Sequence, residues 1–315
     1  MRGRVVRGLG SAGLVVALSV AGCSGAPPGS VTPATQLPTS AADGDTVTTS
    51  ATSTAAPSSS TEPTAAAPPT TPPTSPPPSP TTAPAPTTPT TPSTPPAAQL
   101  VELWSGLDVE SFDTERKVVA LTFDGGASDT GVQAILDTLE SEDVAATFFV
   151  TGDFARAYPD SVRAMAEGGH PVGNHSDTHP HFPASTNEEI RAELSAAESA
   201  IRPLTGAPTA PLFRFPFGDR TPLDITVVNR AGYIPIRWTV DTLGWQGTSG
   251  DITAAIVRQR VLDTLRPGQV VLMHVGAHPT DGSTLDADAL AGIITRLRDR
   301  GYDFVTVPEL LVDGP

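Results

Sequence analysis

His175 and His179 stand four residues apart, in the sequence His-Ser-Asp-Thr-His. On a helical turn this spacing places both imidazoles on one face, which is a chelating arrangement. Neutral imidazole suits zinc and other borderline divalent metals. An isolated pair with this spacing also arises by chance. Here all six histidines fall in two short windows, 170–181 and 274–278, which favours the interpretation as a metal site.

Apolar runs typical of strands alternate with segments of helical periodicity from residue 117 onward. The strand-like runs cover 117–123, 145–150, 212–215, 233–240, 269–274 and 302–307. The helical patterns cover 131–140, 155–167, 188–201, 252–265 and 288–300. This alternation predicts an α/β fold with a parallel sheet, either an open doubly wound sheet or a (β/α) barrel.

Four polar residues favour the barrel over the open sheet. Asp124, Arg214, Asp241 and His274 each lie at or just after the end of a strand-like run. A (β/α) barrel gathers its active site at the carboxyl ends of its strands. We therefore expect these four side chains to lie near one another and near the histidine pair.

Residues 1–23 have the features of a bacterial lipoprotein signal peptide. Three arginines precede an apolar run at 14–18 that is too short for a comfortable membrane span. The run is followed by Val20-Ala21-Gly22-Cys23, which is similar to a lipobox with Cys23 as the acylated residue. Cys23 is the only cysteine, so a lipid explains it better than a leftover thiol does. The alternative is an ordinary cleaved signal peptide.

Residues 24–99 consist mainly of Pro, Thr, Ser and Ala, and 20 of the 34 prolines lie here. Such a composition offers nothing to bury, so we expect a disordered, polyproline-like linker. Fully extended at about 3.1 Å per residue, roughly 75 residues would span on the order of 230 Å. The linker could hold a globular head well away from the extracytoplasmic face of the cell membrane.

Residues 100–315 are long enough for one domain with a sizeable core. They carry 16 Lys and Arg against 31 Asp and Glu. This acidic balance argues against nucleic acid or an anionic bilayer surface as a partner of the head. An uncharged or partly cationic polymer fits the charge better.

Five segments, in this order, resemble the motifs of the NodB-type polysaccharide deacetylases, carbohydrate esterase family four. They are Thr122-Phe123-Asp124-Gly125-Gly126, His175 to His179, Arg214-Phe215-Pro216-Phe217-Gly218, Asp241-Thr242-Leu243-Gly244-Trp245 and Leu272-Met273-His274. The resemblance covers residues 117–307. It implies a distorted (β/α) barrel that removes acetyl groups from amino sugars or acetylated xylan with the help of a divalent metal.

The resemblance also implies a role for each matching residue. Asp124 matches the general base, and Arg214 matches the residue that holds this aspartate. His274 matches the general acid, and Asp241 matches the carboxylate behind that histidine. His175 and His179 match the metal ligands, with zinc the expected metal and cobalt the alternative.

Three further positions match the surroundings of the acetyl group. Trp245 and Leu272 match its apolar walls, and the backbone N–H of Phe217 matches an oxyanion donor. We also expect His278 to line the pocket, without assigning it a role.

One departure concerns the metal. The family usually has a second aspartate in its first motif as a metal ligand, whereas Gly125 stands in that place. Two histidines and water make a poor site, so another carboxylate is needed. Asp129 and Asp124 are nearest in sequence, and Asp177 should face away from the pair. The third ligand is left open.

The leading hypothesis is a membrane-tethered monomer that deacetylates a cell-wall or extracellular polysaccharide, with peptidoglycan as the expected substrate. One alternative is a polysaccharide-binding lipoprotein with a degenerate metal site, which Gly125 would favour. Another is an O-acetyl esterase of the xylan type. A glycosidase that pairs Asp124 with Asp241 is a further option, which the motif order and the histidine pair disfavour.

Overall fold

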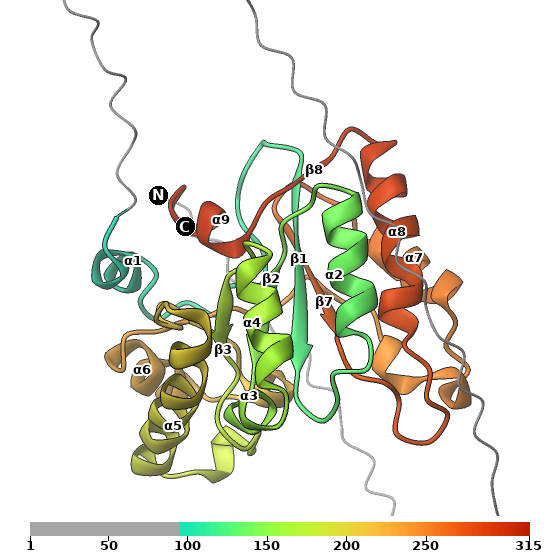
Figure 1. The fold of residues 1–315 in the computed structure, drawn as a ribbon. Helices are drawn as coiled ribbons and strands as arrows, with labels where there is room; N and C mark the ends of the chain where they lie inside the picture. Colours follow the sequence, from blue (N-terminus) through green and yellow to red (C-terminus); the bar gives the residue numbers. More distant parts are fainter. Residues whose placement is uncertain (1–94) are drawn as a thin grey trace, which may run out of the picture. The chain divides into compact units, whose positions relative to one another are not determined.

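The computed structural model describes residues 95–315 (Figure 1). The predicted signal peptide, the lipobox at Cys23 and nearly all of the predicted linker lie outside these residues. Helix α1 begins at Ala97, three residues before the expected domain boundary. None of the helices within residues 95–315 combines the length and the apolar character needed to cross a membrane.

The described residues contain a parallel sheet of eight strands in the order β5-β4-β3-β2-β1-β7-β6, with β8 beside the first residues of β1. The strands are β1 (Val118–Gly125), β2 (Thr147–Val150), β3 (Val172–Asn174), β4 (Leu212–Phe213), β5 (Ile234–Pro235), β6 (Val240–Asp241), β7 (Gln269–His274) and β8 (Asp303–Phe304). Within this part of the chain no ladder joins β5 to β6. The sheet is therefore a curled partial barrel, which confirms the predicted α/β fold.

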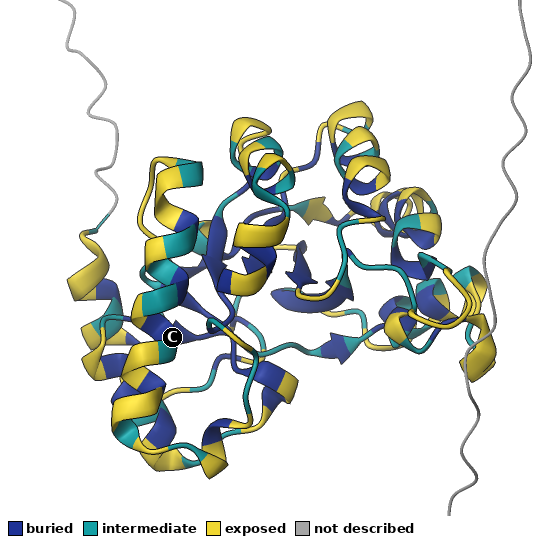
Figure 2. Cartoon of the chain, turned by 60° about the horizontal axis from the view of Figure 1, so that its bottom comes forward, coloured by how far each residue is buried: buried dark blue, intermediate teal, exposed yellow. Residues whose placement is uncertain are grey.

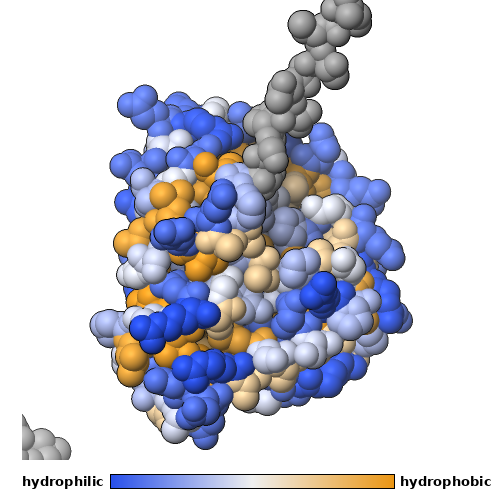
Figure 3. All heavy atoms as spheres, turned by 90° about the vertical axis from the view of Figure 1, so that its left-hand side faces the viewer, coloured by the Kyte–Doolittle hydropathy of each residue, from blue (hydrophilic) through white to orange (hydrophobic). Residues whose placement is uncertain are grey.

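Helices surround the sheet and turn their exposed faces outward (Figure 2). They are α1 (Ala97–Leu103), α2 (Val132–Ser141), α3 (Gly152–Ala157), α4 (Pro159–Glu167), α5 (Asn187–Thr205), α6 (Pro222–Arg230), α7 (Ala254–Asp263), α8 (Leu285–Arg298) and α9 (Val307–Leu311). Four short 3-10 turns are η1 (Phe182–Ala184), η2 (Pro216–Gly218), η3 (Gly244–Gln246) and η4 (Thr248–Gly250). On the face at the left of Figure 1, hydrophobic and hydrophilic residues are interspersed (Figure 3).

The central strand β1 divides its side chains between two cores. Val119, Leu121 and Phe123 belong to the outer core, which packs against the helices. Val118 and Ala120 belong to the inner core, on the concave side of the sheet. Because side chains alternate along a strand, Thr122 and Asp124 continue the inner set.

The inner core is filled by apolar side chains at the amino end of the strands. Trp104, which follows α1, Leu310 of α9 and Val305 close this end. Toward the carboxyl ends of the strands the residues on the concave side become polar. Asp124 follows the apolar residues of β1, and His274 is the last residue of β7. The sequence therefore places packed apolar side chains at the amino ends of the strands and reactive polar side chains at their carboxyl ends.

Two predicted elements are divided in the structure. The expected helix 155–167 is two helices, because Pro159 is the first residue of α4 and proline cannot continue the hydrogen bonding of α3. The expected strand 233–240 is β5 and β6 with a break between them. In this break the carbonyls of Ile236 and Arg237 accept hydrogen bonds from the Arg214 side chain.

Candidate active site

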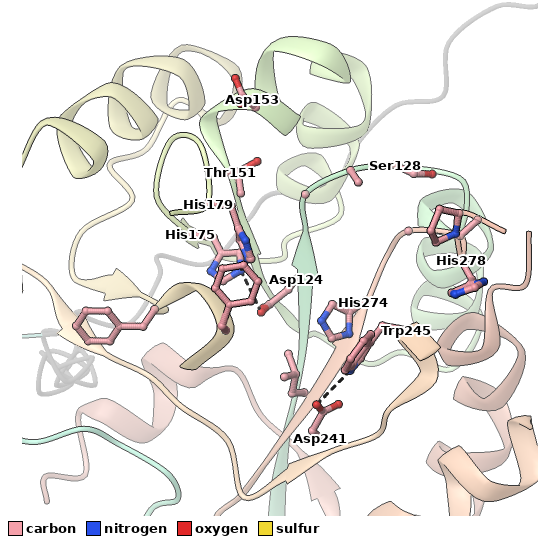
Figure 4. A pocket seen from close by; sticks show the side chains of 18 of the residues that line it. Asp124, Ser128, Thr151, Asp153, His175, His179, Asp241, Trp245, His274 and His278 are labelled. Carbon is pink, nitrogen blue, oxygen red and sulfur yellow. Dashed lines mark hydrogen bonds and ion pairs between the residues drawn. The ribbon is translucent and has the colours of Figure 1, made fainter. Parts of the chain in front are cut away.

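A cleft of about 640 Å³ opens at the carboxyl ends of the strands (Figure 4). Most of the predicted site residues line it: Asp124, His175, His179, Phe217, Asp241, Trp245, Leu272 and His274. His278 lines it too, as predicted, whereas Asp129 is not among its lining residues. Arg214 is fully buried beneath it. The topology thus assembles residues that are up to 154 positions apart in the chain, from Asp124 to His278.

Asp124 and Arg214 form a buried ion pair at the base of the cleft. Nη1 of Arg214 donates to Oδ1 of Asp124 at 2.6 Å, and neither side chain is more than 7% exposed. The other two guanidinium nitrogens also donate hydrogen bonds. Nε donates to the carbonyl of Ile236, and Nη2 donates to the hydroxyl of Thr122 and to the carbonyl of Arg237.

The ion pair keeps the Asp124 carboxylate ionised. Burial by itself raises the pKa of this group, but the positive charge of Arg214, followed by His175 and His274, lowers the pKa further than burial raises it. The net pKa of Asp124 lies below its usual value. A carboxylate that is ionised and oriented in this way can act as a base.

The segment from His175 to His179 is a loop, so the predicted helical turn is wrong. β3 ends at Asn174, and Ser176 and His179 have positive φ angles of 67° and 63°. Local side-chain hydrogen bonds stabilise the loop: Asn174 accepts from the backbone N–H of Ser176, and Ser176 accepts from that of His179. The loop brings the two imidazoles together without a helix.

The histidine pair is arranged as ligands would be. The two Nε2 atoms are 3.2 Å apart, and Nδ1 of His175 lies 2.9 Å from the carbonyl of Arg214. A carbonyl can only accept, so Nδ1 carries the proton and Nε2 of His175 is left as an acceptor. Burial lowers the pKa of both imidazoles, that of His179 to about 4. Both rings are therefore neutral near pH 7.

A divalent metal fits this donor set in part. Two ligands on a tetrahedral zinc, each about 2.0 to 2.1 Å from it, are about 3.3 Å apart, close to the separation of the two Nε2 atoms. Oδ2 of Asp124 lies 3.4 Å from Nε2 of His175, so it is the carboxylate nearest to a third position. In residues 95–315 no three His, Cys, Asp or Glu side chains are already arranged as a complete metal site.

The other candidates for a third ligand lie elsewhere. Oδ2 of Asp129 accepts a hydrogen bond from Ser161, outside the cleft. Oδ1 of Asp177 pairs with Arg156 at 2.8 Å, which agrees with the expectation that it faces away from the histidines.

Gly125 does not face the histidine pair. It continues the outer set of β1, and a Cβ atom there would lie 3.1 Å from Val150 and 3.4 Å from the ring of Phe154. Both neighbours belong to the outer core. A side chain at position 125 would therefore begin in an apolar environment.

His274 lies across the cleft from the histidine pair (Figure 4). Burial lowers the pKa of its imidazole, but Asp286, Asp124 and Asp241 raise it by more, so the net pKa is above the usual value. A raised pKa favours the protonated imidazole, which is the form that a general acid requires. The role of His274 as the proton donor stays a prediction.

The structure corrects the predicted position of Asp241. Its Oδ2 accepts from Nε1 of Trp245 at 3.2 Å, and its Oδ1 accepts from the backbone N–H of Leu243. Among the described residues, no hydrogen bond and no ion pair joins Asp241 to His274. Asp241 acts on His274 only through its charge and otherwise fixes the tryptophan.

Aromatic rings form part of the cleft wall. Phe217 has a positive φ of 58°, and its exposed ring stacks on His181 with the ring centroids 4.1 Å apart. Trp245 is 49% exposed, and Leu272 is buried at the base. That the backbone N–H of Phe217 binds an oxyanion stays a prediction.

Sequence reasoning missed two residues of the site. Thr122 lies inside the first motif, and the strand period could have placed it beside Asp124 on the inner face. Asp286 lies in the first turn of α8, where an acidic residue is ordinarily explained by the helix dipole. Its side chain instead contacts His274, which no spacing in the sequence indicates.

Comparisons with known proteins agree with this geometry. Residues 112–236 match the family model for polysaccharide deacetylase. A peptidoglycan-N-acetylglucosamine deacetylase of Bacillus cereus is 35% identical over 195 residues, which are 61% of this chain and 67% of that protein. The structure of Bacillus subtilis PdaA, a family 4 carbohydrate esterase, is 28% identical, with a TM-score of 0.61 over 68% of this chain and 88% of that chain.

A similar structure also exists for a protein described as a pseudoenzyme. A pseudoenzyme of the same esterase family from Bacillus anthracis is 28% identical, with a TM-score of 0.60 over 66% of this chain and 69% of that chain. The fold therefore occurs in proteins described as deacetylases and in one described as a pseudoenzyme.

Proposed function

Because the chain belongs to the polysaccharide deacetylase family, we propose that it hydrolyses N-acetyl groups of a cell-wall polysaccharide, with peptidoglycan as the substrate. The observation that carries this proposal is the meeting of Asp124, clamped by Arg214, with the histidine pair and His274 in one cleft. Amide hydrolysis needs a base for the attacking water, charge stabilisation and a proton for the leaving amine. These residues can supply all three.

The base and the acid lie at the carboxyl ends of neighbouring strands, where Asp124 pairs in register with His274. Asp124 takes a proton from the water that attacks the acetyl carbon. His274 donates a proton to the amine nitrogen as its bond to that carbon breaks. The products are acetate and a free amino sugar, and the pKa shifts of both residues favour these roles.

We propose His175 and His179 as the ligands of a divalent metal, zinc rather than cobalt. When bound, such an ion acts as a Lewis acid toward the acetyl oxygen. Arg214 contributes through its carbonyl, which accepts from Nδ1 of His175 and fixes the tautomer that leaves Nε2 free. The third ligand stays open, because Asp124 has Oδ1 held by Arg214 and needs Oδ2 free to act as the base.

The exposed rings of Phe217 and Trp245 support a sugar polymer as substrate. Both line the cleft, and the tryptophan is held by its hydrogen bond to Asp241. Flat apolar surfaces with a few fixed polar groups are typical of small-molecule sites. The acidic charge of the domain would also suit a product that gains amino groups.

A non-catalytic polysaccharide-binding protein is the second candidate function. The incomplete metal site and the likeness to a pseudoenzyme favour it. The intact pair of Asp124 and Arg214 favours the enzyme, since a binding protein has no need of a buried, clamped base. A glycosidase would need one protonated carboxyl group, and the lowered pKa of Asp124 disfavours that role for it.

The test is acetate release from peptidoglycan, chitooligosaccharides and acetylated xylan, each with and without a chelator. Release from N-acetylated substrates that a chelator abolishes supports the proposal. Release from acetylated xylan alone would indicate the O-acetyl esterase, and binding without release would indicate the second candidate.

For location, we propose an extracytoplasmic protein that is tethered through a lipid on Cys23. The lipobox-like sequence before Cys23 supports this, and the likeness to peptidoglycan deacetylases agrees with a place at the cell wall.

A further inference from the structure

The carboxylate of Asp286 is buried against the end of β7. The residue lies in the first turn of α8 and is 3% exposed. Its Oδ2 accepts the backbone N–H of His274 at 2.9 Å, and its Oδ1 accepts the hydroxyl of Thr242 at 2.6 Å. Both carboxylate oxygens are therefore fixed, one by each of the two strand ends that border the cleft.

The imidazole of His274 has one ring nitrogen that faces this carboxylate. Nδ1 is buried and has no hydrogen-bond partner within residues 95–315. Oδ2 of Asp286 lies 3.8 Å from it, longer than a hydrogen bond but close enough for a strong charge interaction. A buried polar nitrogen without a partner is rare, and the adjacent acid explains it.

The absence of a side chain at Gly244 makes room for this carboxylate. A Cβ atom at position 244 would lie 2.7 Å from Oδ2 of Asp286 and closer still to its Oδ1. The place that a side chain of residue 244 would fill is thus occupied by a carboxylate that comes from α8. Thr242, two residues earlier, anchors that carboxylate from the same loop.

We propose that Asp286 is the positioning residue of His274, holding the imidazole with Nδ1 protonated so that Nε2 serves the proton transfer in the cleft. The catalytic part of this inference rests on the proposed function, whereas the orientation of the ring does not. Asp286 acts through His274 and need not touch the substrate. It takes the place behind the histidine that the sequence assigned to Asp241.

The first test compares Asp286→Asn with Asp288→Asn. Asp288 lies one half-turn further along α8 and is exposed, so it offers the same change of charge on the same helix. Asp286→Asn should lower kcat on the order of 10²-fold with little change in KM, because the acid is misplaced while the cleft is kept. Asp288→Asn should match the wild type. Wild-type kcat in Asp286→Asn would overturn the proposal.

The second test moves the carboxylate to another element. Asp286→Ala empties the space, and Gly244→Asp in the same chain returns a carboxylate to it from η3. The double variant should recover at least tenfold over Asp286→Ala, whereas Gly244→Asp alone places two carboxylates in one space and should lose activity. A folded double variant that is no more active than Asp286→Ala would contradict the proposal.

The third test needs no turnover. Nitrogen-15 NMR of the His274 imidazole in the metal-free protein, recorded above the raised pKa so that the ring is neutral, should show Nδ1 protonated in the wild type and a shift toward the other tautomer in Asp286→Ala. The same tautomer in both proteins would overturn the inference. If the wild type releases no acetate but the tautomer depends on Asp286, the proposed function fails and the positioning role stands.

Discussion

Arg214 and Asp124 form an ion pair that is closed to solvent, with Nη1 2.6 Å from Oδ1 and side chains 0% and 7% exposed. The guanidinium also stacks over the ring of Phe149, with its central carbon 4.2 Å from the ring centroid. Five polar and aromatic neighbours thus fix one arginine beneath the cleft. The arginine that holds the proposed base, Asp124, therefore also anchors this part of the sheet.

Replacing this arginine should cost stability as well as activity. Arg214→Met leaves Asp124 buried without its partner, and we expect the free energy of unfolding to fall by about 3 to 5 kcal/mol. Urea unfolding measures this loss. Arg116→Met is the matched control, since Arg116 pairs with Asp313 at 2.9 Å on the surface, with side chains 52% and 43% exposed. Exposed pairs contribute at most about 1 kcal/mol, so equal losses in both variants would contradict the account.

The pH profile of activity should follow the two shifted groups. Asp124 must be ionised, and because its pKa is lowered from 3.8, it should not limit activity above pH 4. His274 must be protonated, and because its pKa is raised from 6.5, activity should persist above that pH and fall as the pH rises through the raised value. Asp286→Asn should move this alkaline limb to lower pH. An alkaline limb at or below pH 6.5 in the wild type would contradict these assignments.

The same shifts have a defined effect on folding. His274 has a higher pKa in the folded state, so its contribution to stability is full below pH 6.5 and is lost as the pH rises through the folded value. Asp124 has a lower pKa in the folded state, so its contribution is full above pH 3.8 and is lost as the pH falls.

Gly125→Asp should not create a tighter metal site. The new side chain would start beside Val150 and Phe154, so its charge would be buried without a partner, at a cost of roughly 3 kcal/mol or more. Gly126→Asp is the comparison variant, because it adds a carboxylate to the cleft lining at a position where nothing lies within 4 Å of the added Cβ. Zinc calorimetry beside thermal unfolding checks both variants. Tighter zinc binding by a fully stable Gly125→Asp protein would show that position 125 does face the metal.

The sequence was sufficient to predict most of the strands and most of the residues at their ends. Alternation of apolar runs and helical segments gave the parallel sheet, and the five motifs gave most of the cleft lining. Strand β3 was missed because Val172, Gly173 and Asn174 offer only one strongly apolar residue. The loop after it was predicted as a helical turn because a spacing of four does not distinguish a helix from a loop closed by Asn174 and Ser176.

The remaining difference concerns the carboxylate that lies nearest to His274. The predicted partner of His274 was Asp241, which is near in the motif order, whereas the structure brings Asp286 from a helix. Contacts between distant segments depend on tertiary packing, which the spacing of residues within one motif does not predict.

The predicted lipid attachment at Cys23 can be tested independently of the cleft. If it carries the lipid, the mature chain should be recovered with membranes, and Cys23→Ser should release it or block its processing. Membrane fractionation with mass spectrometry of the N-terminal peptide measures both outcomes. A wild-type protein recovered wholly in an unlipidated form would contradict the predicted anchor.

The most direct measurement is acetate release from N-acetylated peptidoglycan by the wild type, Asp124→Asn and His274→Ala at neutral pH. Each variant removes one partner of the proton transfer, so each should lose on the order of 10² to 10⁴ in rate while still folding. Asp124→Asn should also lower the free energy of unfolding, because it leaves the buried Arg214 without its charged partner. A chelator should reduce the wild-type rate to a similar extent. Wild-type rates in either folded variant, or no release by the wild type with and without added zinc, would contradict the account.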